Sequence, residues 1–165
     1  AGPHRGRVVR LRRTRPSIEV APGETTLASA MTADGRAVCG TRDALYLPFR
    51  IPWEQVESAD WDSETSTLRV LETDAEPFRL VLEDDEPRRL LELIRERVTA
   101  SVVIHRHIAV VGNRGLRVIA RRAPGRRDDL QWRTSYDEGV DPEDPEVRRL
   151  AAQTLASAKS DVGLA

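Results

Sequence analysis

Short apolar runs separated by turn residues constrain the fold of this chain more than any other feature of its sequence. Between residues 26 and 82, six such runs alternate apolar and polar residues or are apolar throughout. They cover residues 26–32, 37–41, 44–47, 54–61, 67–72 and 77–82. Turn-forming clusters rich in Asp, Gly, Pro and Ser separate them, and runs of this length between such clusters are typical of strands. Consecutive short strands joined by tight connections predict an antiparallel meander.

An amphipathic helix is predicted to follow these strands. Residues 83–87 read Glu-Asp-Asp-Glu-Pro, and acids favour the positive end of a helix while proline fits its first turn. Leu90, Leu91, Ile94 and Val98 then recur at helical spacing, opposite charged residues. Such a stripe normally faces the core, so we expect the helix to lie across the sheet.

The last third of the chain predicts three more strands and a second helix. The strand-like segments cover residues 107–111, 115–122 and 130–136. Asp144 and Pro145 then open a segment with a helical apolar stripe that ends at Gly163. The apolar faces of this β-β-β-α extension are too small to be stable alone, so we expect it to pack on the first part.

The segment from Arg42 to Asp62 adds a resemblance to this pattern. It contains the step Pro52-Trp53-Glu54 and a following strand that ends in Trp61. With one amphipathic helix after the strands, it resembles bacterial pleckstrin-homology-like domains over residues 24–104. The resemblance implies a bent sandwich or barrel closed at one end by the helix, whose exposed strands and loops bind proteins or lipids.

The expected fold class is therefore α+β, with mostly antiparallel strands. We expect a basic N-terminal arm over residues 1–23, a pleckstrin-homology-like domain over 24–104, and the β-β-β-α extension over 105–165 packed on it. Trp53 and Trp61 flank short strands. We expect both to anchor the core, because a large apolar side chain at such a position normally fills it.

Composition indicates the source and the compartment. Lys159 is the only lysine, so 25 of the 26 basic Lys and Arg residues are arginine, a bias typical of GC-rich, actinobacterial coding sequences. Cys39 is the only cysteine, which excludes an intrachain disulfide and favours a reducing cytoplasm. No apolar run approaches the ~20 residues of a membrane helix, and the first residues lack the apolar stretch of a secretion signal. We expect a cytoplasmic protein without a transmembrane segment.

The residue patterns of catalytic and metal sites are missing from the sequence. His105 and His107 would share one face of a strand and could supply two metal ligands, but no third ligand is evident nearby. Cys39 lies among small residues, where a buried thiol behaves as a small hydrophobe. No glycine-rich phosphate loop, Gly-x-Ser-x-Gly or His-Glu-x-x-His motif is present. We therefore predict a protein that is not an enzyme and has no cofactor or metal.

A basic hairpin is the one local candidate for binding. With Leu116, Val118 and Ala120 facing the core, strand alternation turns Arg117 and Arg121 outward. The candidate binding residues are Arg114, Arg117, Arg121, Arg122, Arg126, Arg127 and Arg133. Such a face suits an acidic protein surface, RNA or anionic lipid heads. The alternative is a solvated face compensated by the acid-rich residues 54–92.

These observations lead to one functional prediction and one alternative. The prediction is a non-enzymatic cytoplasmic adaptor or interaction protein with a protein partner. The alternative is an RNA- or ribosome-associated protein that uses the basic hairpin and the arginine-rich residues 5–15. Anionic lipid is the least favoured partner.

Overall fold

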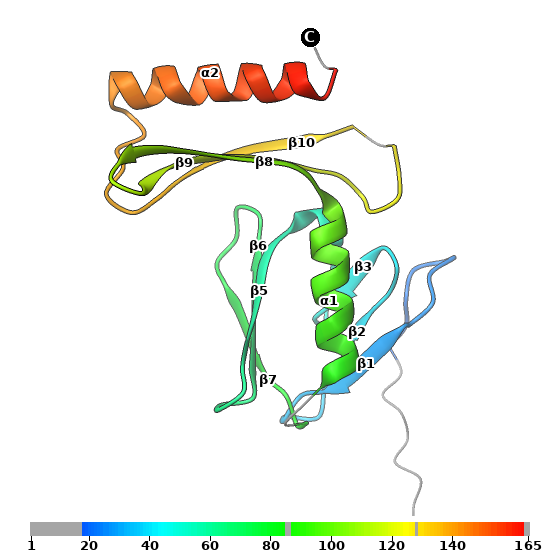
Figure 1. Ribbon diagram of the computed structural model, residues 1–165. Coiled ribbons are helices and arrows are strands. Elements are labelled where there is room, and N and C mark those ends of the chain that lie inside the picture. The colour runs from blue at the N-terminus through cyan, green and yellow to red at the C-terminus, as the bar shows by residue number, and fades with distance from the viewer. Residues whose placement is uncertain (1–17, 85–86, 128, 164–165) are drawn as a thin grey trace, which may run out of the picture.

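The computed structural model describes residues 18–84, 87–127 and 129–163, and within them the chain is an α+β protein with three antiparallel sheets and two helices. Figure 1 shows two units, one built on two of the sheets and α1, the other on the third sheet and α2. The α+β class and the antiparallel pairing predicted from the sequence are confirmed.

The first unit contains two meanders. One sheet has the order β1-β2-β3-β4, formed by Ala28–Met31, Ala37–Gly40, Ala44–Tyr46 and Arg50–Pro52. The other has the order β5-β6-β7, formed by Val56–Asp62, Thr67–Glu72 and Phe78–Val81. A 3-10 turn, η1 (Trp53–Gln55), joins them, and a bridge between Thr32 and Leu82 connects the ends of β1 and β7. The two sheets therefore meet at one corner through β1 and β7 and are linked at another by η1.

Helix α1 (Arg88–Ser101) completes the core of this unit. It contacts β1, β2, η1 and β5, and Figure 1 shows it between the two sheets. Its Leu90 and Ile94 are buried beside Trp53, which is fully buried and donates from Nε1 to the Thr41 carbonyl at 2.9 Å. Burial of each large apolar side chain contributes roughly 1.5–3 kcal/mol. The stripe predicted from the sequence is thus the face that α1 buries.

The second unit continues directly from α1. Its sheet has the order β10-β9-β8, formed by Gln131–Tyr136, Arg114–Arg121 and Val102–Val111. Helix α2 (Pro145–Asp161) covers the sheet face turned away from the first unit (Figure 1). The Asp144 carboxylate caps it by accepting from two backbone N–H groups, and Leu116, Val118 and Ala120 of β9 share a core with α2. The predicted β-β-β-α order is the one observed.

Two element predictions differ from the structure. Residues 48–52 lie between two of the predicted strands and were assigned to a turn because of Pro48 and Pro52, but they include the edge strand β4. The third part was expected to begin with a strand at His107, whereas β8 starts at Val102, immediately after α1. The basic arm is described only from residue 18 onward, so its arginines at positions 5–15 lie outside the described residues.

Candidate functional site

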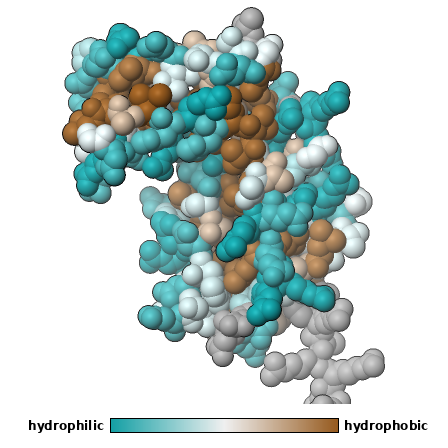
Figure 2. Space-filling model, in the orientation of Figure 1, coloured by the Kyte–Doolittle hydropathy of each residue, from teal (hydrophilic) through white to brown (hydrophobic). Residues whose placement is uncertain are grey.

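A groove with an apolar floor lies between β5 and α1. Its volume is about 530 Å³. Ala59, Trp61 and Leu68 line it from the sheet, and Leu91, Ile94 and Val98 line it from the helix. In Figure 2, hydrophobic surface is visible beside the hydrophilic side chains in the area where Figure 1 draws α1. We call this cavity the β5–α1 groove.

The strand register explains why this groove is apolar. Ala59 pairs with Val70 and Trp61 pairs with Leu68 across β5 and β6, and cross-strand partners share one face of a sheet. Leu68 and Val70 are buried, so Ala59 and Trp61 face the same side as the core. Because the helix does not cover them completely, both side chains stay partly exposed.

One wall of the groove is a strand edge that no other strand covers, although the Glu57 carbonyl of β5 already accepts from Arg121. In the sheet order β5-β6-β7, β5 pairs only with β6, so among the described residues its other edge has no strand neighbour. Alternate residues of an edge strand direct backbone N–H and C=O groups away from the sheet, and these groups can pair with an added strand. The groove thus offers backbone hydrogen-bonding groups next to an apolar floor.

Arg95 gives the groove an uncompensated positive charge. Its side chain lines the cavity and is exposed, and no hydrogen bond or ion pair joins it to another described residue. Asp60, the acidic residue in the lining, instead pairs with Arg69 at 3.6 Å. A carboxylate entering the groove would therefore find a free guanidinium partner.

The two tryptophans expected to anchor the core have different positions. The prediction is confirmed for Trp53, which is 0% exposed. Trp61 packs against the core on one side but is partly exposed and lines the β5–α1 groove. Trp61 therefore packs against the core as expected, but one side of it stays open to the groove because α1 does not cover it completely.

Arg121, one of the hairpin arginines, is buried rather than turned to solvent. Its relative exposure is 7%, and its Nη2 donates to the Glu57 carbonyl at 3.4 Å. Burial lowers the pKa of Arg121, while the charge of Glu57 opposes this shift. Strand alternation correctly places Arg121 opposite the α2-facing side of β9. The prediction of exposure is wrong because the first unit covers that face at Arg121.

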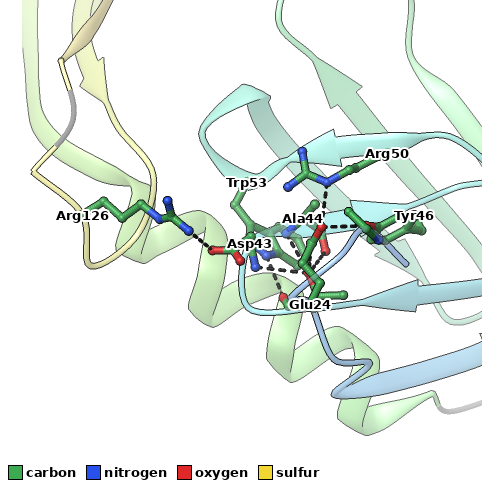
Figure 3. Close-up of polar contacts among 9 residues, drawn as sticks. Glu24, Asp43, Ala44, Tyr46, Arg50, Trp53 and Arg126 are labelled. Carbon is green, nitrogen blue, oxygen red and sulfur yellow. Dashed lines mark hydrogen bonds and ion pairs between the residues drawn. The ribbon is translucent and has the colours of Figure 1, made fainter. Parts of the chain in front are cut away.

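The other hairpin arginines contact several different places. Arg133 pairs with Glu57 and with Asp74 of the first unit, the latter at 2.6 Å. Arg126 reaches Asp43 at 3.5 Å, as Figure 3 shows. Within the second unit, Arg117 pairs with Asp137 at 3.4 Å and Arg114 donates to the Glu138 carbonyl at 3.4 Å. Arg122 and Arg127 have no such partner among the described residues.

These contacts divide the predicted basic face. Arg121 and Arg133 hold the second unit against acidic residues of the segment 54–92, so part of the charge is internal. Arg114 and Arg117 remain exposed on β9. Binding of a partner by the remaining arginines stays a prediction.

His105 and His107 lie in a different unit from Cys39, with Cys39 in β2 and both of these histidines in β8. His105 and His107 are exposed on β8, and His107 contacts Asp137 at 3.3 Å. The Gly115 backbone N–H and His107 lower the pKa of Asp137. The described residues contain no group of three His, Cys, Asp or Glu side chains that could hold a metal ion. Burial raises the pKa of the Cys39 thiol, which keeps it protonated at neutral pH.

Sequence reasoning missed a polar cluster around Glu24. The Glu24 side chain is only 5% exposed and accepts hydrogen bonds from Thr41 Oγ1 at 2.6 Å, Tyr46 Oη at 2.9 Å and Arg50 Nε at 3.0 Å (Figure 3). The Tyr46 hydroxyl also accepts from the Ala21 backbone N–H at 2.9 Å. Glu24 therefore joins the segment before β1 to β3 and β4. A single acid after Pro22-Gly23 carries no sequence signal for this role.

Among the described residues, neither helix combines the length and apolar character that a membrane-crossing helix needs. No protein-family model, curated protein or solved structure gives a significant match to the chain.

Proposed function

We propose that this chain is a non-enzymatic interaction protein that binds an extended segment of a partner protein in the β5–α1 groove. The observation that carries the proposal is the combination of an apolar floor, an open strand edge and the unpaired Arg95 in one cavity. The segment would add as a strand to β5 and place apolar side chains over Ala59, Trp61 and Leu68. This mode of recognition takes affinity from backbone hydrogen bonds and specificity from side-chain pockets.

The element order of the first unit supports a pleckstrin-homology-like fold as part of the same proposal. A four-stranded and a three-stranded antiparallel sheet follow one another in sequence, and a single helix contacts strands of both. This is the order of elements that the resemblance of residues 24–104 implies. Folds host many functions, so the partner is argued from the groove and not from this likeness.

The charge and the apolar floor of the groove indicate which kind of partner segment it can bind. Arg95 would pair with a carboxylate of the partner, from an acidic side chain or from a chain end. The floor favours apolar side chains at alternate positions, because successive residues of a strand point to opposite sides. The expected ligand is therefore an extended acidic segment with alternating apolar residues.

A peptide selection on the full chain tests the proposal. Peptides selected from a random displayed library should have this pattern, and their affinities can be measured by fluorescence anisotropy. Arg95→Glu should lower the affinity for the selected peptides by about tenfold or more, because it replaces attraction by repulsion at one contact. Arg89→Glu is the matched control, since Arg89 is an exposed residue of α1 outside the groove lining.

Hydrogen exchange gives a second and independent readout. Bound peptide should slow exchange of backbone amides in β5 (Val56–Asp62) more than in the other edge strands. Peptides that bind Arg95→Glu as tightly as the parent, or that protect strands away from β5, would contradict the proposal.

Fewer arginines are free to bind RNA, the alternative partner, than the sequence suggests. Arg121, Arg126 and Arg133 each contact the first unit.

A further inference from the structure

A second cavity lies where the two units meet, on the other flank of α1. We call it the junction pocket. Its volume is about 570 Å³, and its lining includes Leu27, Arg42, Asp43, Leu93, Arg97 and Arg126. Volumes of roughly 300–1,000 Å³ are usual for small-molecule sites. Leu93 and Arg97 lie one turn apart on α1, on a different side from Leu91, Arg95 and Val98, so the junction pocket is separate from the β5–α1 groove.

Three guanidinium groups from three different elements line this pocket. Arg42 comes from the β2–β3 turn, Arg97 from α1 and Arg126 from the β9–β10 connection. A Cβ placed on Gly125 would lie 3.5 Å from an Arg42 nitrogen. Arg42 therefore extends to the connection that carries Arg126, and folding brings together charges that are distant in the sequence.

The carboxylates of the pocket leave part of this charge uncompensated. Arg97 pairs with Glu96 at 2.7 Å, and Arg126 lies 3.5 Å from Asp43. The second contact (Figure 3) is longer than the roughly 2.7–2.9 Å of a charge-assisted hydrogen bond. Glu24 is already occupied by Arg50 and two hydroxyl donors. Arg42 has no hydrogen-bond or ion-pair partner among the described residues.

We propose that the junction pocket binds the phosphate monoester group of a small organic molecule or of a lipid head. A phosphate monoester carries roughly 1.5 to 2 negative charges at neutral pH, so it needs more than one cation. The planar guanidinium matches phosphate oxygens in pairs. Arg42 is free to bind it, and Arg126 can exchange its long contact with Asp43 for a phosphate oxygen. Leu27 and Leu93 would contact the organic part of the ligand.

Calorimetric titration of the full chain tests this site with defined probes. Glycerol phosphate should bind saturably and more tightly than inorganic phosphate, because only the ester can contact the leucines. Arg42→Gln should lower the affinity for glycerol phosphate by about tenfold or more. Asp43→Asn should raise this affinity several-fold, because the carboxylate that competes for Arg126 is gone. Arg148→Gln should leave affinity unchanged, since Arg148 is exposed on α2, far from this lining in the sequence and outside it.

Vesicles separate the two sources of the phosphate group. A lipid source is assigned if the protein co-floats with vesicles that contain phosphatidic acid but not with vesicles of phosphatidylcholine alone. The Arg42→Gln variant should then lose this co-flotation. Saturable binding of glycerol phosphate without flotation assigns a soluble ligand. The proposal is overturned if neither probe binds at concentrations up to about 10 mM. It is also overturned if Arg42→Gln, with an unchanged melting temperature, binds like the parent, or if Asp43→Asn weakens binding.

Discussion

The Glu57 carboxylate should make the main ionic contact that holds the two units together. The substitution Glu57→Gln tests this. Glu57 lies on β5 of the first unit and pairs with Arg133 of β10, while Arg121 donates to its backbone carbonyl. Arg121 is 7% exposed and Glu57 acts on it as a nearby opposite charge. Replacing the carboxylate by an amide removes the charge that compensates both arginines and keeps the size of the side chain.

The burial of the pair sets the expected magnitude. Exposed ion pairs contribute roughly 0.2–1 kcal/mol, and removing one member of a fully buried pair costs roughly 3–5 kcal/mol. The side chains of Glu57 and Arg133 are 19% and 35% exposed, between these limits. We expect Glu57→Gln to lower the free energy of unfolding by roughly 1–3 kcal/mol. Asp74→Asn is the matched control, because Asp74 pairs with the same arginine but is 80% exposed.

Urea denaturation followed by circular dichroism measures both variants. Asp74→Asn should cost less than about 1 kcal/mol, and its cost should vanish in ~1 M salt, where exposed charges are screened beyond ~3 Å. The cost of Glu57→Gln should largely persist there. A double-mutant cycle with Arg133→Gln should give a coupling energy of roughly 0.5–3 kcal/mol. Equal costs for the two single variants, with no coupling, would refute the idea that burial makes Glu57 different from Asp74.

Three further predictions concern the first unit. Trp53→Ala should cost roughly 3–5 kcal/mol in the same denaturation assay, because the side chain is fully buried; a cost below about 1 kcal/mol would contradict its role in the core. Burial acts to raise the pKa of Glu24, but its hydrogen bonds to Thr41, Arg50 and Tyr46 together lower it below the ordinary value. The lowered pKa stabilises the fold at neutral pH and the stabilisation is lost as pH falls through that pKa, so the parent should exceed Glu24→Gln in stability at pH 7 but not in strong acid; a stability difference independent of pH would contradict this. Residues 24–104 alone should melt below the full chain, because they lack Arg121 and Arg133; a sharp transition at the full-length temperature would show that the second unit adds no stability.

Local patterns predicted the elements well because burial acts on one face of each element. Phe78 and Leu80 lie on the same side of β7, and the apolar stripe of α1 is buried as its spacing predicts. The strand β4 was missed because Pro48 and Pro52 are turn signals. Proline is nevertheless tolerated at a sheet edge, where its missing N–H costs no ladder hydrogen bond, and β4 is an edge strand.

The β5–α1 groove could not be predicted in the same way. Its two walls are separate in sequence, and the pattern of each wall indicates only that one face is apolar. How far α1 covers Trp61 depends on the angle and position at which the helix crosses the sheet, which no local pattern encodes. The same holds for Arg121, since strand alternation gives the face of a residue and not what covers that face.

Charge was the least predictable feature, because almost every basic residue is the same amino acid and only the fold distinguishes their roles. The acid-rich residues 54–92 meet the arginines of the second unit at the junction of the units, where Glu57 and Asp74 contact Arg133. In such pairs the two charges compensate each other within the protein, so they are not available to a binding partner. Arg95 and Arg42 lie on opposite flanks of α1, each lines a cavity and neither is paired among the described residues. We therefore expect this protein to recognise an anionic group where an unpaired arginine also lines a cavity, since the total charge does not distinguish such positions.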